Sequence, residues 1–243
     1  MNTKNTAFLA VILVSMFSFT AIAEAQNMDA NQALSAKQQS IVPIAAFTAN
    51  GDLQKLKTAL NEGLGAGLTI NEIKEVLVQL YAYAGFPRSL NSINTFIGVL
   101  EEREQKGIKA ELGKEPSPMP ANKSSIDVGT EIQTRLIGAP ATGKYIAFAP
   151  AIDRFLKGHL FGDIFGRDNL DFQSREIATI SALSSMTGVN AQLQSHFNVG
   201  FNVGLTQEQM RSLISVLELK VGKKEADNAF DILEKVITAR GQK

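Results

Sequence analysis

The sequence contains two copies of one unit, and this duplication constrains the fold more than any other feature. The same spacing of 137 residues separates Thr69 from Thr206, Gly85 from Gly222, and Asn91 from Asn228. Solenoid repeats are only about 20–50 residues long, so this spacing indicates a duplicated domain. The copies have diverged, because Ala59 occupies the position that corresponds to His196. Any chemistry that needs this histidine therefore belongs to the second copy alone.

Both copies carry the same helix signals. Thr69 with Glu72, and Thr206 with Gln209, form capping boxes that predict a helix start at Ile70 and at its counterpart. Apolar residues then recur at helical spacing until a glycine ends each helix, and a further helix follows. Alternating apolar and polar residues, which are typical of strands, are scarce. The sequence therefore predicts an all-α fold of tandem helical domains.

The copies and their flanking segments define four regions. We expect a signal peptide over residues 1–25, a first repeat over 26–103, a linker over 104–125 and a second repeat over 126–243. The linker is charged and then contains three closely spaced prolines, a composition typical of a crossing loop. The second repeat begins with short amphipathic segments, Ile132 to Ile137 and Ala151 to Phe165, that have no obvious counterpart in the first. These segments predict an additional lid or docking element.

The N-terminus has the composition of an export signal. Lys4 precedes a short apolar run from Ala7 to Thr20, and small residues at 21–25 predict cleavage after Ala23 or Ala25. The run is shorter than the roughly 20 apolar residues of a membrane-spanning helix, and no other stretch approaches that length. We therefore expect a soluble protein that is exported to a bacterial periplasm.

The charge balance and the absence of cysteine exclude two classes of function. Lys+Arg and Asp+Glu each number 24, so the formal net charge is zero, whereas a nucleic-acid partner requires a basic face. The cysteine count is zero, which excludes thiol chemistry. A neutral surface is compatible with a small-molecule enzyme or binding protein and with a structural oligomer.

The segment from Asp171 to Gly204 holds the most informative polar residues. Asp171 is a predicted N-cap, and the helix after it carries Arg175 and Glu176. In the next helix His196 lies on a face of apolar residues at spacings of three and four, which is typical of a buried face. Gly200, one turn further on, leaves space beside the imidazole for a small ligand or for a closely packed helix. A histidine in such a place is either a core residue with a polar neighbour or a functional group.

At this point the sequence resembles the carboxymuconolactone decarboxylase family of the AhpD-like superfamily. The resembling segments are residues 162–167 (Gly-Asp-Ile-Phe-Gly-Arg), Leu170-Asp171, Arg175-Glu176, residues 193–196 (Leu-Gln-Ser-His), residues 202–206 (Asn-Val-Gly-Leu-Thr) and, in the first copy, residues 79–87 (Gln-Leu-Tyr-Ala-Tyr-Ala-Gly-Phe-Pro). Together they extend over about Leu34 to Lys235. The resemblance implies an AhpD-like helical fold in both repeats.

The two branches of this superfamily make different chemical demands. The alkylhydroperoxidase branch uses a Cys-x-x-Cys pair seven and four residues before the histidine, where this chain has Val189 and Gln192. Peroxide reduction needs a thiolate, so we disfavour a peroxidase. The decarboxylase branch, which lacks these cysteines, converts a carboxylated muconolactone to an enol-lactone without a metal or organic cofactor. The resemblance therefore implies a carboxy-lyase with no cofactor.

Decarboxylation of this kind needs a proton donor and cations that hold carboxylates. The resemblance implies that His196 supplies the proton and that Glu176 orients its imidazole. Arg175 and Arg167 are candidate carboxylate ligands, because a guanidinium binds a carboxylate with two hydrogen bonds. Each of these charged residues has a structural alternative as a solvated pair. The remaining candidates are Phe86 and Pro87, as a substrate wall or a helix stop, and His159, as a surface or interface residue.

The difference between the copies predicts one composite site per chain. The first copy keeps the loop at Gly85 but lacks the histidine, whereas the second keeps His196 and has Gly222 in a different loop. Single-domain relatives form hexamers, so a fused duplicate is expected to form a homotrimer. The alternative to an enzyme is a periplasmic binding or assembly protein on the same fold. Convergence of the two arginines, Glu176 and His196 on one cavity would favour the enzyme.

Overall fold

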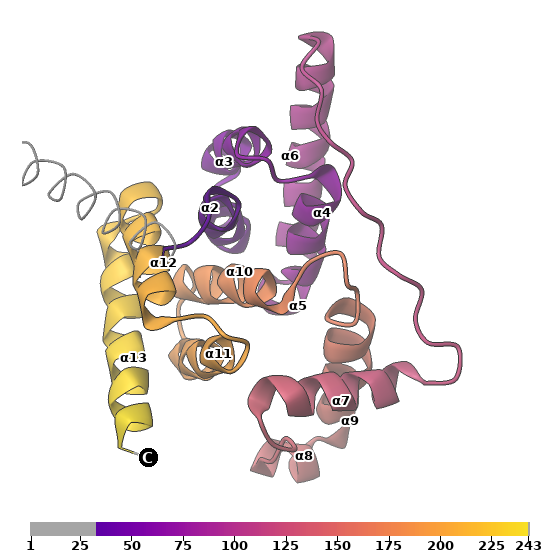
Figure 1. Ribbon diagram of the computed structural model, residues 1–243, viewed down its shortest axis with the longest axis vertical. Coiled ribbons are helices and arrows are strands. Elements are labelled where there is room, and N and C mark those ends of the chain that lie inside the picture. Colours follow the sequence, from indigo (N-terminus) through magenta and orange to yellow (C-terminus); the bar gives the residue numbers. More distant parts are fainter. Residues whose placement is uncertain (1–32, 243) are drawn as a thin grey trace, which may run out of the picture.

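The computed structural model describes residues 33–242, and every regular element in that range is a helix (Figure 1). The first repeat contains α2 (Ala36–Asn50), α3 (Leu53–Gly65), α4 (Ile70–Gln79), α5 (Tyr81–Ala84) and α6 (Phe86–Gln105). The second contains α10 (Phe172–Ser184), α11 (Asn190–Asn202), α12 (Gln207–Lys220) and α13 (Lys223–Gly241). The predicted all-α class is confirmed, whereas the signal peptide predicted over residues 1–25 lies outside the described residues.

The two repeats pack against each other through equivalent helices. The first helices of the repeats, α2 and α10, lie in contact at the centre of the molecule. The third helix of each repeat crosses to the other, since α12 packs on α2 while α4 and α5 pack on α10. One apolar core runs through both repeats and includes Leu60, Leu77 and Phe197. The predicted tandem duplication therefore produces one body with approximate two-fold symmetry.

The helix boundaries follow the predicted caps, with one difference near Gly85. Both capping boxes are formed, by Thr69 and by Thr206. The sequence predicts one helix from Ile70 to the glycine, but α4 ends at Gln79 and α5 forms a separate turn. The next helix begins at Phe86, earlier than its apolar periodicity indicates. Pro87 is tolerated in its first turn, because the backbone N–H groups of a first turn have no partner within the helix and proline lacks this group.

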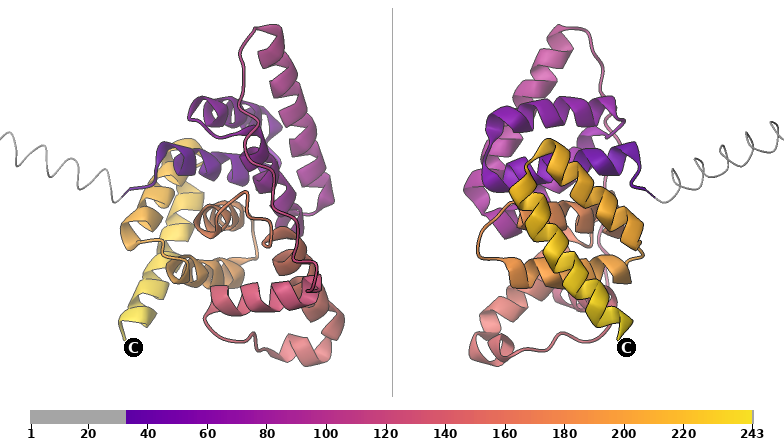
Figure 2. Two further views of the ribbon diagram at one scale, coloured as in Figure 1. Left: turned by 45° about the vertical axis from the view of Figure 1, so that its right-hand side comes forward. Right: turned by 90° about the vertical axis from the view of Figure 1, so that its left-hand side faces the viewer.

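A cover of four helices precedes the second repeat. It consists of α7 (Ser125–Ile137), α8 (Lys144–Phe148), α9 (Pro150–Arg154) and the π-helix η1 (Phe155–Ile164). Glycines allow α7 and η1 to touch through their backbones: a Cβ on Gly129 would lie 1.7 Å from the Lys157 carbonyl oxygen, and one on Gly162 would lie 2.2 Å from that of Ser125. Both views of Figure 2 show this cover, in pink and salmon, at one end of the molecule. We call it the α7–η1 cover.

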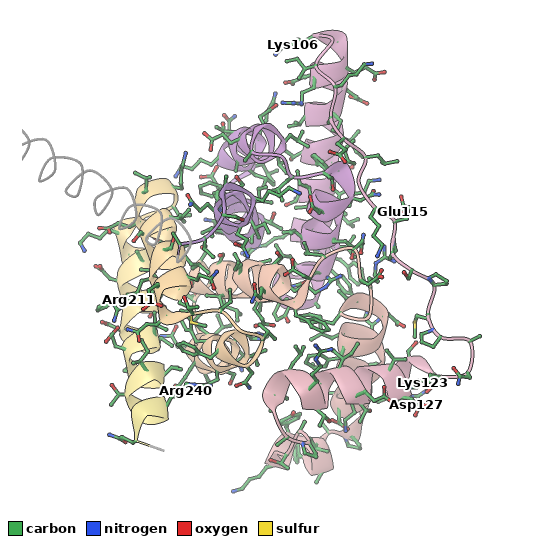
Figure 3. The ribbon with its side chains drawn as sticks, in the orientation of Figure 1. Lys106, Glu115, Lys123, Asp127, Arg211 and Arg240 are labelled. Atoms are coloured by element: carbon green, nitrogen blue, oxygen red, sulfur yellow. The ribbon has the colours of Figure 1, made fainter. Side chains whose placement is uncertain are left out.

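The segment between α6 and α7 crosses the first repeat without helical structure. Figure 3 labels Lys106, Glu115 and Lys123 along it, from the far end of α6 to the approach to α7. The segment is fixed to the start of α4, because the Ile70 amide donates to the Glu111 carbonyl oxygen at 2.9 Å. Further along, Lys114 pairs with Asp168 at 2.8 Å. The segment thus connects the first repeat to the turn that precedes α10.

The described residues contain neither a helix that could span a membrane nor a cluster of metal ligands. Within residues 33–242 no helix combines the length and the apolar character that crossing a bilayer requires. The same part of the chain contains no group of three or more His, Cys, Asp or Glu side chains placed to hold a metal ion.

Candidate functional site

His196 and Glu176 form a hydrogen-bonded pair between the first two helices of the second repeat. The His196 Nδ1 atom lies 2.8 Å from the Glu176 Oε2 atom. The side chain of Glu176 is 1% exposed and that of His196 is 16% exposed, so the imidazole lies between the buried carboxylate and the edge of the core. A buried carboxylate needs a polar partner, and the imidazole provides one. The pair that the sequence suggested is therefore present, with one ring nitrogen directed away from the carboxylate.

Tyr83 adds a side chain from the first repeat to this pair. Its ring meets the His196 ring edge-on, with 5.5 Å between the centroids. Burial and the negative charge of Glu176 raise the pKa of the Tyr83 phenol well above its ordinary value. The Glu176 Oε1 atom is buried and has no hydrogen-bond partner among the described residues, and the buried Tyr83 Oη atom has beside it the Thr179 hydroxyl, which partly offsets the rise of the Tyr83 pKa. The site is therefore a triad built from both repeats.

An apolar cluster from the α7–η1 cover closes one side of the triad. Its buried members are Leu136, Leu160, Phe161, Ile164 and Phe165. Tyr81, Tyr83, Phe172, Val199 and Val203 pack against this cluster from α5, α10 and α11. Because Val199 and Val203 follow His196 on α11 at helical spacing, the cover lies over the face of that helix that carries the histidine.

A cavity of about 320 Å³ opens beside the same face of α11, where α7, α10 and α11 meet. Its lining residues are Arg135, Asp171, Phe172, Gln173, Asn202 and Val203. The Arg135 guanidinium lies 5.4 Å from the centre of the Phe172 ring, which is a cation–π distance. Phe172 lies one helical turn before Glu176 on α10, whereas Tyr83, Glu176 and His196 themselves do not line this cavity. Arg135 thus contributes a positive charge to a cavity near the triad.

Arg167 and Arg175 do not converge on His196, because both bind the carboxylate of Glu75 on α4. Arg167 donates from Nε at 2.9 Å and from Nη2 at 2.7 Å to Oε1 of Glu75. Arg175 is 0% exposed and donates to the other oxygen at 3.2 Å. It also donates to Gln79 at 3.0 Å. Their role as ligands of a substrate carboxylate therefore has no support in this geometry, since a carboxylate of the protein already occupies them.

The three charges of this cluster are strongly coupled. Burial alone would raise the pKa of Glu75, but the hydrogen bond from Arg167 and the positive charges of both arginines outweigh burial, and the net pKa lies below its ordinary value. Burial lowers the pKa of Arg175, which Glu75 opposes. Since Glu75 belongs to the first repeat and both arginines to the second half of the chain, the cluster ties the two halves together.

The other predicted site residues lie at the surface or within helix contacts. Phe86 is 62% exposed and its ring stacks on Tyr81 at 4.3 Å, while Pro87 is exposed in the first turn of α6. His159 is half exposed and pairs with Asp163 at 2.9 Å, as expected of a surface residue. Phe86 and Pro87 therefore lie on the surface beside α5, and the ring contact of Phe86 is with Tyr81.

Gly200 serves helix packing. A Cβ at this position would lie 2.8 Å from Met210 and 3.3 Å from Leu205. Its counterpart Gly63 would meet Ile44 and Leu68 in the same way. Of the two alternatives that the sequence left open, the closely packed helix is correct and the space for a ligand is not. The predicted N-cap, Asp171, does accept from the Ser174 amide at 2.8 Å.

Sequence reasoning missed Tyr83, Glu75 and Arg135. A signal for Tyr83 was present, since its counterpart 137 residues later is Lys220 and this pair diverges just as Ala59 and His196 do. Glu75 diverges in the same way, since its counterpart is Ser212, whereas Arg135 has no counterpart in the first copy. Neither residue indicated a site, because charged residues in amphipathic helices are usually solvated.

Comparison with known proteins shows the family of this chain. The Carboxymuconolactone decarboxylase family matches residues 18–96 and 150–235, one segment in each repeat. The chain therefore belongs to the carboxymuconolactone decarboxylase family. It is similar to the 4-carboxymuconolactone decarboxylase of Acinetobacter baylyi, with 24% identity over 117 residues that cover 46% of this chain and 87% of the relative. The relative is thus matched by about one repeat.

Proposed function

We propose that this protein is a carboxymuconolactone decarboxylase-like carboxy-lyase that acts on a small carboxylated lactone or a related acid. The observation that carries the proposal is the His196–Glu176 pair, in which a buried carboxylate orients an imidazole beside a cavity. Imidazole is the side chain whose ordinary pKa lies nearest neutrality, which suits it to deliver a proton. When carbon dioxide leaves, the electron pair is delocalised toward the lactone carbonyl, and His196 protonates the ring carbon next to that carbonyl, which gives the enol-lactone. Glu176 holds the imidazole and stabilises its charged form. These steps use no cofactor.

Arg135 takes the role that the sequence suggested for Arg167 and Arg175. It lines the cavity near the triad, lies over the Phe172 ring and forms no ion pair among the described residues, so its guanidinium can receive a substrate carboxylate. Replacing Arg135 with glutamine should raise KM for carboxylated lactones about tenfold and leave kcat nearly unchanged, because binding is lost equally from ground and transition states. Steady-state kinetics separate the two parameters. A fall in kcat at constant KM would contradict this role.

The experiment that tests the proposed activity is a direct assay of the mature protein. It is incubated with a panel of carboxylated lactones while carbon dioxide release and ring absorbance are followed. Turnover of at least one compound supports the enzyme. Saturable binding without turnover would instead support the alternative, a periplasmic binding or assembly protein on the same fold. The occupation of both Arg167 and the buried Arg175 by Glu75 is the observation that favours this alternative.

The proposal includes export to a bacterial periplasm, on the evidence of the leader sequence, and assembly as a homotrimer. An exposed apolar stripe on α6 supports the assembly, because Phe86, Leu90 and Ile97 are 62%, 54% and 48% exposed on one side of that helix. Light scattering should give about three times the mass of the mature chain. A monomeric mass would contradict the trimer and leave the proposed chemistry unaffected.

A further inference from the structure

The triad contains two buried polar atoms whose hydrogen-bonding capacity the protein does not fill. Glu176 Oε1 has no partner among the described residues, and Tyr83 Oη has beside it only the Thr179 hydroxyl, which already donates to the Arg175 carbonyl oxygen. Buried polar groups are hydrogen-bonded in the great majority of cases, so these two atoms leave capacity for hydrogen bonds to another molecule. The tyrosine hydroxyl is a donor and the carboxylate oxygen is an acceptor.

The protonation of Tyr83 decides which part it can play. Burial, followed by the charge of Glu176, raises the pKa of its phenol, so the hydroxyl keeps its proton at neutral pH. A phenol that keeps its proton is a hydrogen-bond donor and cannot act as a base. Such a donor stabilises negative charge that develops on a nearby oxygen.

The equivalent place in the other half, related by the approximate two-fold symmetry, differs at all three positions of the triad. The counterparts of Glu176, His196 and Tyr83 are Gln39, Ala59 and Lys220. Gln39 and Lys220 line a cavity of about 290 Å³, and Lys220 pairs there with Glu62 at 3.1 Å.

Several residues that serve packing and capping are the same in both copies. Gly63 and Gly200 are both kept, and so are Thr69 and Thr206. The replacement of Tyr83 together with the histidine and the glutamate links it to the function of the site.

We propose that Tyr83 is a catalytic residue that donates a hydrogen bond to the lactone carbonyl oxygen of the substrate. This rests on the proposed function. When the bond to the carboxylate carbon breaks, its electron pair moves into the conjugated lactone, and carbon dioxide leaves. The carbonyl oxygen then carries the negative charge that the Tyr83 hydroxyl stabilises. A proton from His196 to carbon restores the neutral ring, and His196 regains its proton from solvent.

The chain is well suited to test this, because it contains three tyrosines, at 81, 83 and 145, and two histidines. Incorporation of 3-fluorotyrosine gives three fluorine resonances. The variants Tyr81→Phe and Tyr145→Phe assign two of them, so the third is assigned to Tyr83 without altering it. The probe is paraconate, a saturated carboxylated γ-lactone that cannot delocalise the electron pair. We expect paraconate to shift the Tyr83 resonance and to leave that of Tyr145, on α8, in place.

Kinetics provide the second measurement. Tyr83→Phe should lower kcat about 10²-fold with little change in KM, the usual cost of removing one such donor, while Tyr145→Phe should match the parent. If paraconate shifts the His196 ring protons but not the Tyr83 fluorine, the ligand binds elsewhere in the site and the role of Tyr83 is refuted while the proposed function stands. If neither signal moves and no lactone is turned over, both proposals fail.

Discussion

Replacing Glu75 with alanine is expected to lower the free energy of unfolding by about 3–5 kcal/mol, the usual cost of breaking a buried ion pair. The reason is that Arg175, which is 0% exposed, would keep its charge without the carboxylate that balances it. For a chain of this size the expected fall in Tm is roughly 6–20 °C. Thermal and denaturant unfolding followed by circular dichroism measure both quantities.

A matched control is Glu102→Ala, which removes the carboxylate of an exposed pair with Lys57. Exposed pairs of this kind contribute little, so its Tm should stay close to that of the parent. Equal destabilisation by the two substitutions would contradict the role assigned to the buried cluster.

The same cluster predicts a dependence on pH. Because the pKa of Glu75 is lower in the folded protein than its ordinary value, its contribution is complete above the ordinary glutamate pKa and is lost as the pH falls through the folded pKa. The parent should therefore lose stability below about pH 4.3 more steeply than Glu75→Ala does. Parallel curves for the two proteins in this range would mean that Glu75 does not make this contribution.

The second large effect is expected at His196. Replacing it with alanine should lower kcat by about 10²–10⁴, the usual contribution of a positioned proton donor. The chain supplies its own control in its other histidine, His159, which is half exposed and pairs with Asp163. His159→Ala should turn over substrate at the rate of the parent. Carbon dioxide release under saturating substrate measures both variants.

The pseudo-symmetric position offers a sharper control. Ala59→His should create no second activity, because Gln39 and Lys220 occupy the places of the glutamate and the tyrosine. Full activity in His196→Ala, with the fold and the oligomeric state unchanged, would show that the histidine is a core residue whose polar neighbour satisfies it.

Local signals and the duplication predicted most of the fold. The capping boxes at Thr69 and Thr206 placed two helix starts correctly, and the constant spacing between the copies predicted a second set of helices equivalent to the first. The start of α6 was predicted too late, because the periodicity of its apolar residues does not reveal a proline that begins a helix.

The candidate site was predictable only where residues lie close in the sequence. His196 and Glu176 are 20 residues apart on consecutive helices, and their pairing could be anticipated. Arg175 reaches Glu75 across 100 residues, and no local pattern indicates which carboxylate a buried arginine will meet. Tyr83 joins the triad only because α5 of the first repeat packs on α10 of the second.

The covalent fusion of the repeats frees their sequences from symmetry. When two identical chains form a dimer, every substitution appears at both equivalent places, so a change that benefits one location must be tolerated at the other. Here Lys220 could replace the counterpart of Tyr83, and pair with Glu62, while Tyr83 itself was retained. A tight ligand of the triad should accordingly saturate at one molecule per chain, and each half of the molecule can accumulate its own changes without altering the other.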